Sequence, residues 1–234
     1  QTASHAYLRG RIAWSRADFE AAHIAYEQCI ELSIDSARLD LKRRAVISAA
    51  AIDVIRHKDN AAIDRLELAR ADMITTSSPI SDFDSSLFLA ELYARAGNLS
   101  DANDALDRAQ NAADIIGSAE YRLIVALVSA RLQRNAKLRT PIELADSIPN
   151  RNGEALWQAR IAWNRGPHSI AITALNEARR HGVFESRLVD EARYLAWQLA
   201  QPVPAEQAID PPFPPLAYVV LRRDLREALA ESAR

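Results

Sequence analysis

Two arginine–tryptophan pairs are the residues of this chain best suited to recognition chemistry. Arg11 precedes Trp14 by three residues, and Arg160 precedes Trp163 by the same interval. Residues three apart share one face of a helix, so each guanidinium can lie over an indole ring or offer its donors to a carboxylate or phosphate. Both residue types are enriched among those that dominate binding energy. A second interpretation stays open, in which the indoles fill a seam between helices and the arginines extend to water.

Residues that could support catalysis are scattered. No pair of the five histidines, His5, His23, His57, His168 and His181, has the helical spacing and nearby carboxylate that a zinc site needs. The chain has no glycine-rich phosphate loop and no strand–turn–helix element for a nucleophilic serine. We therefore expect a protein that is not an enzyme and that needs no cofactor and no metal.

The composition of the chain limits the fold class and the kinds of partner that it can be expected to bind. Of the 234 residues, 49% are hydrophobic, 26% are charged and only 6 are glycine, which favours helix. The net charge of −2 gives no general attraction to nucleic acid or anionic lipid. No apolar run reaches the roughly 18 residues of a membrane span. We expect a soluble chain without direct membrane insertion, cytoplasmic or periplasmic, because a cleaved secretion signal would leave no trace.

The chain also repeats itself. The segment Arg11–Ala17 returns almost unchanged at residues 160–166, and in both places a second amphipathic helix is expected to follow. Self-similarity of helix–turn–helix units is typical of a solenoid, in which each unit completes the core of its neighbour. Cys29 lies on the apolar stripe of one such helix, where a thiol behaves as a small hydrophobe.

The spacing within these units resembles the tetratricopeptide repeat. Residues 3–33, 84–114 and 153–182 match best, each with small residues where helices approach closely and large ones between them. In the first unit the small and aromatic positions are Gly10, Ala22 and Cys29, and Trp14, Phe19 and Tyr26. The family has units of about 34 residues, and irregular arrays of this kind occur in bacterial regulators and assembly factors. The resemblance implies an all-α, right-handed α-α superhelix of about five helix pairs over residues 1–200.

The remaining segments match the repeat pattern less well. We expect a helix pair over 36–73, a truncated unit that starts at 118–133 and continues through a capping box at Thr140 and Glu143, and a helix near 184–200. A proline-rich connector at 201–215 leads to a last amphipathic helix over 216–234, with Leu221, Leu225 and Leu229 on one stripe. That helix either caps the array or docks on another protein.

By the same resemblance, the first helix of each unit lines a concave groove. The positions expected to face it are Tyr7, Arg11, Trp14, Glu91, Arg95, Leu156, Arg160, Trp163 and Asn164. This implies a non-catalytic protein–protein interaction scaffold or assembly factor that binds a peptide or partner helix, as part of a larger complex. The alternative is a regulatory or ligand-sensing domain of a larger signalling or transcriptional protein.

Overall fold

A computed structural model describes residues 2–35, 38–72, 78–136, 151–165, 167–180, 189–203 and 219–233. Every regular element in these ranges is a helix and none is a strand, which confirms the all-α prediction. None of these helices combines the length and apolar character needed to cross a membrane. The expected capping box at Thr140 and Glu143 lies outside the described residues, as does the connector beyond residue 203.

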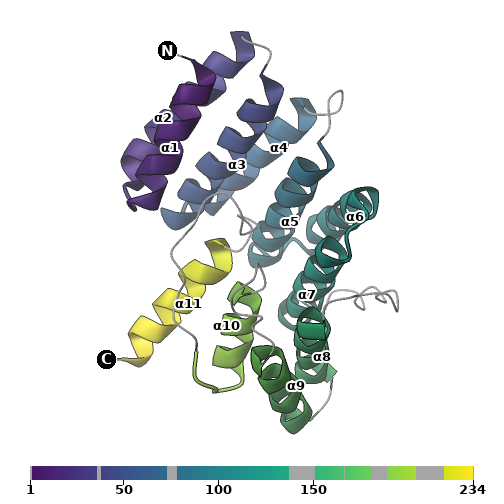
Figure 1. The fold of residues 1–234 in the computed structure, drawn as a ribbon. Helices are drawn as coiled ribbons and strands as arrows, with labels where there is room; N and C mark the ends of the chain where they lie inside the picture. Colours follow the sequence, from purple (N-terminus) through teal and green to yellow (C-terminus); the bar gives the residue numbers. More distant parts are fainter. Residues whose placement is uncertain are drawn as a thin grey trace.

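The helices follow one another along a bent path. Their bounds are α1 (Ala3–Ser15), α2 (Phe19–Asp35), α3 (Leu39–Ile55), α4 (Asp59–Asp72), α5 (Pro79–Arg95), α6 (Leu99–Ile116), α7 (Ala119–Ala136), α8 (Arg151–Arg165), α9 (His168–Arg180), α10 (Val189–Gln198) and α11 (Val219–Ser232). Each helix from α1 to α9 packs against the next, most closely in the pairs α1–α2, α5–α6 and α8–α9. Figure 1 shows α10 and α11 on the inner side of the bend. α5 begins at Pro79, earlier than expected, because proline suits the first turn of a helix.

Three turns between paired helices share one backbone geometry. Ala17, His57 and Gly97 adopt left-handed φ values of 57°, 58° and 78°. In each turn the next amide donates to the carbonyl five residues before it, the bond of a Schellman helix end. From residue 17 to 57, and from 57 to 97, the interval is 40 residues. This interval is longer than the unit of about 34 residues that the resemblance to the tetratricopeptide repeat implies. In the first interval, α2 and α3 have 17 residues each.

The small residues of the first unit permit close helix packing. Gly10, Ala22 and Cys29 are all buried, as their place in the pattern predicts. A Cβ atom added at Gly10 would lie only 2.5 Å from the ring of Tyr26. That ring is itself buried and packs on Tyr7, with the two centroids 5.7 Å apart. It has little room to move, so α1 and α2 depend on the absence of a side chain at Gly10.

We therefore expect Gly10→Ala to lower the free energy of unfolding by about 1–3 kcal/mol, despite alanine's higher helix propensity. Urea denaturation followed by circular dichroism measures the change. The same substitution in a Tyr26→Leu background serves as the control, because the narrower side chain removes the clash and the cost should shrink. Equal losses in both backgrounds would show that the ring contact is not the cause.

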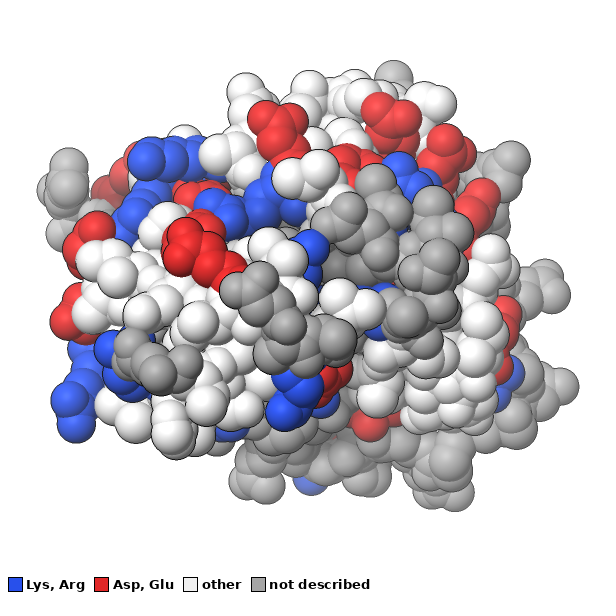
Figure 2. All heavy atoms as spheres, turned by 90° about the horizontal axis from the view of Figure 1, so that it is seen from above, with Lys and Arg blue, Asp and Glu red and all other residues white. Residues whose placement is uncertain are grey.

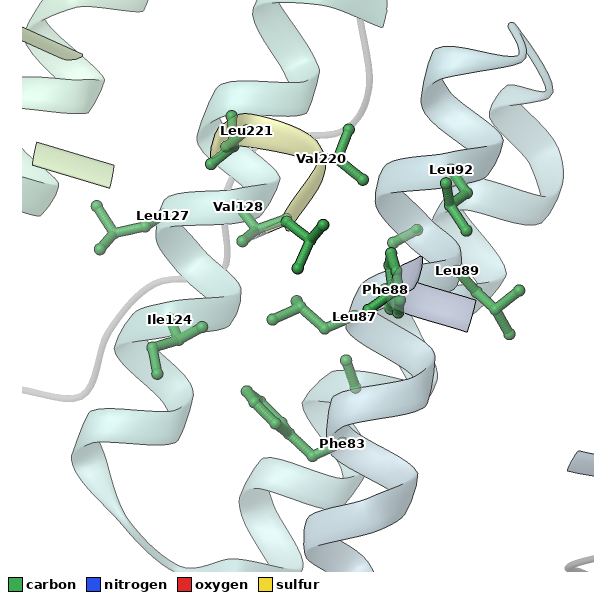
Figure 3. Packing of buried hydrophobic residues seen from close by; sticks show 14 of the residues in the cluster. Phe83, Leu87, Phe88, Leu89, Leu92, Ile124, Leu127, Val128, Val220 and Leu221 are labelled. Carbon is green, nitrogen blue, oxygen red and sulfur yellow. The ribbon is translucent and has the colours of Figure 1, made fainter. Parts of the chain in front are cut away.

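The middle of the core lies around α5. Every residue of this helix from Ser85 to Leu92 is buried, so it is covered on nearly every side by its neighbours. In Figure 3, Phe83 and Leu87 of α5 point toward α7, on the side where Ile124 and Val128 lie, and Val220 and Leu221 of α11 belong to the same cluster. Leu89 and Leu92 point to the opposite side of α5. The C-terminal helix thus contributes to the core at the centre of the chain. α11 also contacts both α3 and α10, so it covers more than the last elements of the array.

Candidate functional site

Four charged side chains form one buried network on the inner side of the bend, here called the inner network: Glu91, Arg131, Arg160 and Glu191. They come from α5, α7, α8 and α10, and each is at most 3% exposed. Arg131 donates to both oxygens of Glu91, with Nη1 at 2.7 Å from Oε2, and its Nε lies 2.8 Å from Oε1 of Glu191. Arg160 Nη2 lies 3.2 Å from the other oxygen of Glu191, and Nη1 donates to Gln198 at 2.5 Å.

The electrostatics of the inner network are balanced, since two guanidinium groups face two carboxylates. Burial raises the pKa of Glu91, against the attraction of Arg131. Burial also opposes the charge of Arg131, but Glu191 and Glu91 together outweigh it and raise the pKa of Arg131. Burial and the charge of Arg131 lower the pKa of Arg160, although an arginine stays protonated in proteins. The ring of Tyr194 lies 6.0 Å and 5.8 Å from the two guanidinium carbons, within the range of cation–π attraction.

A second set of charges, here called the α11 ion pairs, joins the C-terminal helix to three other helices. The set comprises Arg222, Arg223 and Asp224 of α11 with Asp190, Asp59 and Arg95. Arg222 Nε lies 2.9 Å from both oxygens of Asp190 in α10. Arg95 of α5 donates to Asp224 at 2.5 Å and lies 3.1 Å from Asp59.

Arg223 makes the most extensive of these contacts. Its two terminal nitrogens lie 2.7 Å and 3.1 Å from the oxygens of Asp59, at the start of α4. Nη1 also donates to the carbonyl of Val54 in α3 at 2.6 Å. The bonds to Asp59 raise the pKa of Arg223. Fork-shaped pairing of this kind fixes position as well as charge, so α11 is held in one register.

Beside Arg223 lies a cleft of about 500 Å³. Its lining residues are His57, Lys58, Asp59, Asn60, Ala61, Arg95 and Arg223. Six of these seven side chains are polar or charged, and both signs are present. The same mixture occurs on the face seen in Figure 2, where basic and acidic side chains are interspersed. Such a surface recognises matched local charges rather than a partner of one overall sign.

Some of the predicted groove residues lie together in the two charged clusters, and others are buried in the hydrophobic core. Glu91 and Arg160 join the inner network, and Arg95 belongs to the α11 ion pairs. Leu156 is buried in the core, and Trp163 is 9% exposed. Asn164 lies in α8, but its side chain is outside the described residues.

The candidates of the first helix lie apart from these charges. Trp14 is 2% exposed and meets the edge of Phe19 at 5.6 Å between ring centroids. Tyr7 and Arg11 are half-buried. Burial raises the pKa of Tyr7, while the charges of Arg44 and Arg11 oppose that rise. A partner can reach Trp14, Arg160 or Trp163 only if the elements that cover them move.

Seven residues of the inner network and the α11 ion pairs are not predicted from the sequence as site residues: Asp59, Arg131, Asp190, Glu191, Arg222, Arg223 and Asp224. Arg131 offers a signal, because a charge inside the apolar run 123–132 needs a buried partner. The triplet Arg222-Arg223-Asp224 offers none, since charged residues beside a leucine stripe are ordinary on a helix surface.

Chemically, these arrangements hold helices in register. Each carboxylate of the inner network is bound by a guanidinium, so both carboxylates link helices to one another. Within the described ranges, no three or more His, Cys, Asp or Glu side chains are grouped so that they could hold a metal ion. Comparison of the chain with protein-family models, curated proteins and solved structures gives no match in any of the three.

Proposed function

We propose that this protein is a non-catalytic interaction scaffold, a tetratricopeptide-like right-handed superhelix that binds a helix or peptide of a partner protein on the inner side of its bend. The observation that carries the proposal is that this side already holds a helix. α11 lies there through an apolar stripe and through the α11 ion pairs. A helix laid into a groove by its apolar face is a recurring mode of protein recognition.

Preorganisation of the surface supports the same proposal. Glu91, Arg131 and Glu191 fix α5, α7 and α10 relative to one another, so the surface between them has little freedom to lose when a partner binds. A binding site that is rigid before association retains more of its interaction energy as affinity.

A regulatory or ligand-sensing role is the second candidate, and the cleft beside Arg223 is the observation that favours it. Its volume of about 500 Å³ lies within the range of small-molecule sites. A molecule bound there would touch Arg95 and Arg223, which hold α11. Small-molecule pockets are, however, mostly apolar, whereas this lining is mostly charged, so the scaffold role is preferred.

Affinity purification of the tagged full chain from extracts of its own cells, followed by quantitative mass spectrometry, tests the scaffold role. We expect a companion protein in near-stoichiometric amount. Lys58→Glu with Asn60→Glu should reduce its recovery, because both side chains are exposed beside the cleft. Lys58 directly precedes α4 and Asn60 is its second residue, and acidic residues at this end of a helix are compatible with the helix dipole. Arg180→Glu, at the exposed end of α9, is the matched control.

Two outcomes contradict the proposal. Recovery of no stoichiometric companion would count against a scaffold. A companion retained equally by the double variant and by Arg180→Glu would show that the partner binds elsewhere than the inner side.

A further inference from the structure

Only the first half of α11 is covered by the rest of the protein. From Val219 to Leu225 all residues are buried except Asp224, which is partly exposed. Beyond Leu225 the helix carries mostly exposed residues, and Leu229 is 37% exposed although it continues the leucine stripe. About half of this 14-residue helix is therefore anchored, and the other half is mostly exposed, with Glu227 lying 3.6 Å from His57. The leucine stripe of α11 is therefore covered by the rest of the protein only as far as Leu225.

The anchored half relies on ordered charge as well as on apolar contact. Three consecutive residues of α11 each face a residue of opposite charge. Arg222 pairs with Asp190 of α10, Arg223 with Asp59 of α4, and Asp224 with Arg95 of α5. Of these three pairs, Arg222–Asp190 is buried on both sides, whereas Arg223–Asp59 and Arg95–Asp224 are partly exposed. A buried ion pair adds little stability over apolar residues of the same shape, but it penalises any other register or partner. Contacts between separable parts of a chain are also more polar than a core. This interface has the composition of a binding site.

We propose that α11 is a resident ligand of the inner surface, which exchanges with a helix of a partner protein that carries the same recognition pattern. The inference rests on the proposed scaffold function and names its partner chemistry. The partner presents an amphipathic helix with a short apolar run, as in Val219–Leu221, followed by two arginines and an aspartate. While α11 stays in place the surface is closed to that helix, so binding requires that α11 leave.

A synthetic peptide with the sequence of α11, carrying a fluorescent label, is the probe. It is titrated against the wild-type full chain and against the full chain with Arg222→Gln and Arg223→Gln, with fluorescence anisotropy as the readout. These substitutions weaken the resident helix but leave Asp190, Asp59 and Arg95 intact. Apparent affinity falls in proportion to the fraction of molecules whose site is open. We therefore expect the variant to bind the peptide about tenfold or more tightly than the wild type.

A peptide with Arg222→Asp, Arg223→Asp and Asp224→Arg is the matched control. It has the same apolar stripe and reversed charges, so we expect binding at least about tenfold weaker. Equal binding of the two peptides would overturn the recognition pattern. Equal binding of the α11 peptide by wild type and variant, or binding to neither, would overturn the exchange.

Hydrogen exchange of the wild-type chain decides the question if the variant fails to fold. A resident ligand opens on its own, so the amides of Leu221–Leu225 should exchange at least about tenfold faster than those of Leu87–Leu92 in α5. Equal exchange rates would mean that α11 leaves only when the whole protein unfolds, and the inference would fail. Both tests use only this chain and its own helix, so recovery of a cellular companion has no bearing on them. If a companion protein were recovered but the exchange tests failed, the proposed scaffold function would stand and the proposal that α11 is a resident ligand would be rejected.

Discussion

We expect the Arg131→Met variant to lose about 3–5 kcal/mol of unfolding free energy at pH 7. Arg131 is the shared partner of Glu91 and Glu191, which are 3% and 0% exposed. Methionine approximates its length but carries no charge. It leaves Glu91 without its guanidinium and Glu191 with only Arg160. Urea denaturation of wild type and variant, fitted with a common slope, measures the difference.

The loss should depend on pH in a defined direction. Burial already holds the pKa of Glu91 above its ordinary value of 4.5, and Arg131 opposes that rise. Removing Arg131 raises the pKa of Glu91 further. A carboxyl whose pKa is higher in the folded than in the unfolded state loses stability as pH rises through the folded value. The deficit of Arg131→Met against wild type should therefore be smaller at pH 5 than at pH 7.

Two variants separate the lost pairing from the substitution itself. Arg131→Met with Glu91→Met removes both charges, leaves Arg160 paired with Glu191 and should recover most of the stability. Arg38→Met removes an exposed arginine paired with Asp40 and should cost at most about 1 kcal/mol. A double variant as unstable as Arg131→Met alone would contradict the account.

We expect Trp14→Ala to cost about 3–5 kcal/mol of unfolding free energy, because it empties a buried site at the junction of α1 and α2. Trp14→Phe should cost much less. It keeps an aromatic ring beside Phe19 and removes an indole N–H that has no hydrogen-bond acceptor among the described residues. Thermal and urea unfolding of the three proteins give the comparison.

Trp197→Ala is the matched control, since Trp197 is 36% exposed and lies at the end of α10. It should cost clearly less than Trp14→Ala. If Trp14→Ala keeps the stability of the wild type and loses a binding partner instead, Trp14 belongs to a recognition surface and its assignment to the core is wrong.

The helical character of the chain can be predicted because it depends on the local amino-acid sequence. Apolar residues at helical spacing and few glycines specify helices one at a time. Gly10 and Ala22 mark close approaches that depend on neighbours within one hairpin. These features need no knowledge of distant segments, and the structure bears them out at both positions.

The charged sites could not be predicted in the same way. Glu91 is 40 residues from Arg131, and Arg131 is 60 residues from Glu191. No periodicity relates such positions, because the intervening turns and connectors set their register. Arg222 and Asp224 look like any polar helix face in the sequence. Whether that face meets water or opposite charges depends on where α11 returns, which the leucine stripe does not specify.

The return of α11 has a consequence for the order of folding. Arg223 lies 164 residues from Asp59, and Asp224 lies 129 residues from Arg95. Hairpins such as α1–α2 close over a few residues and form quickly, whereas closure over such long loops is entropically costly and slow. During synthesis the surface of α3 and α5 is made long before the helix that covers it. For that period the nascent chain exposes apolar side chains and unmatched charges, and exposed apolar surface of this kind favours aggregation.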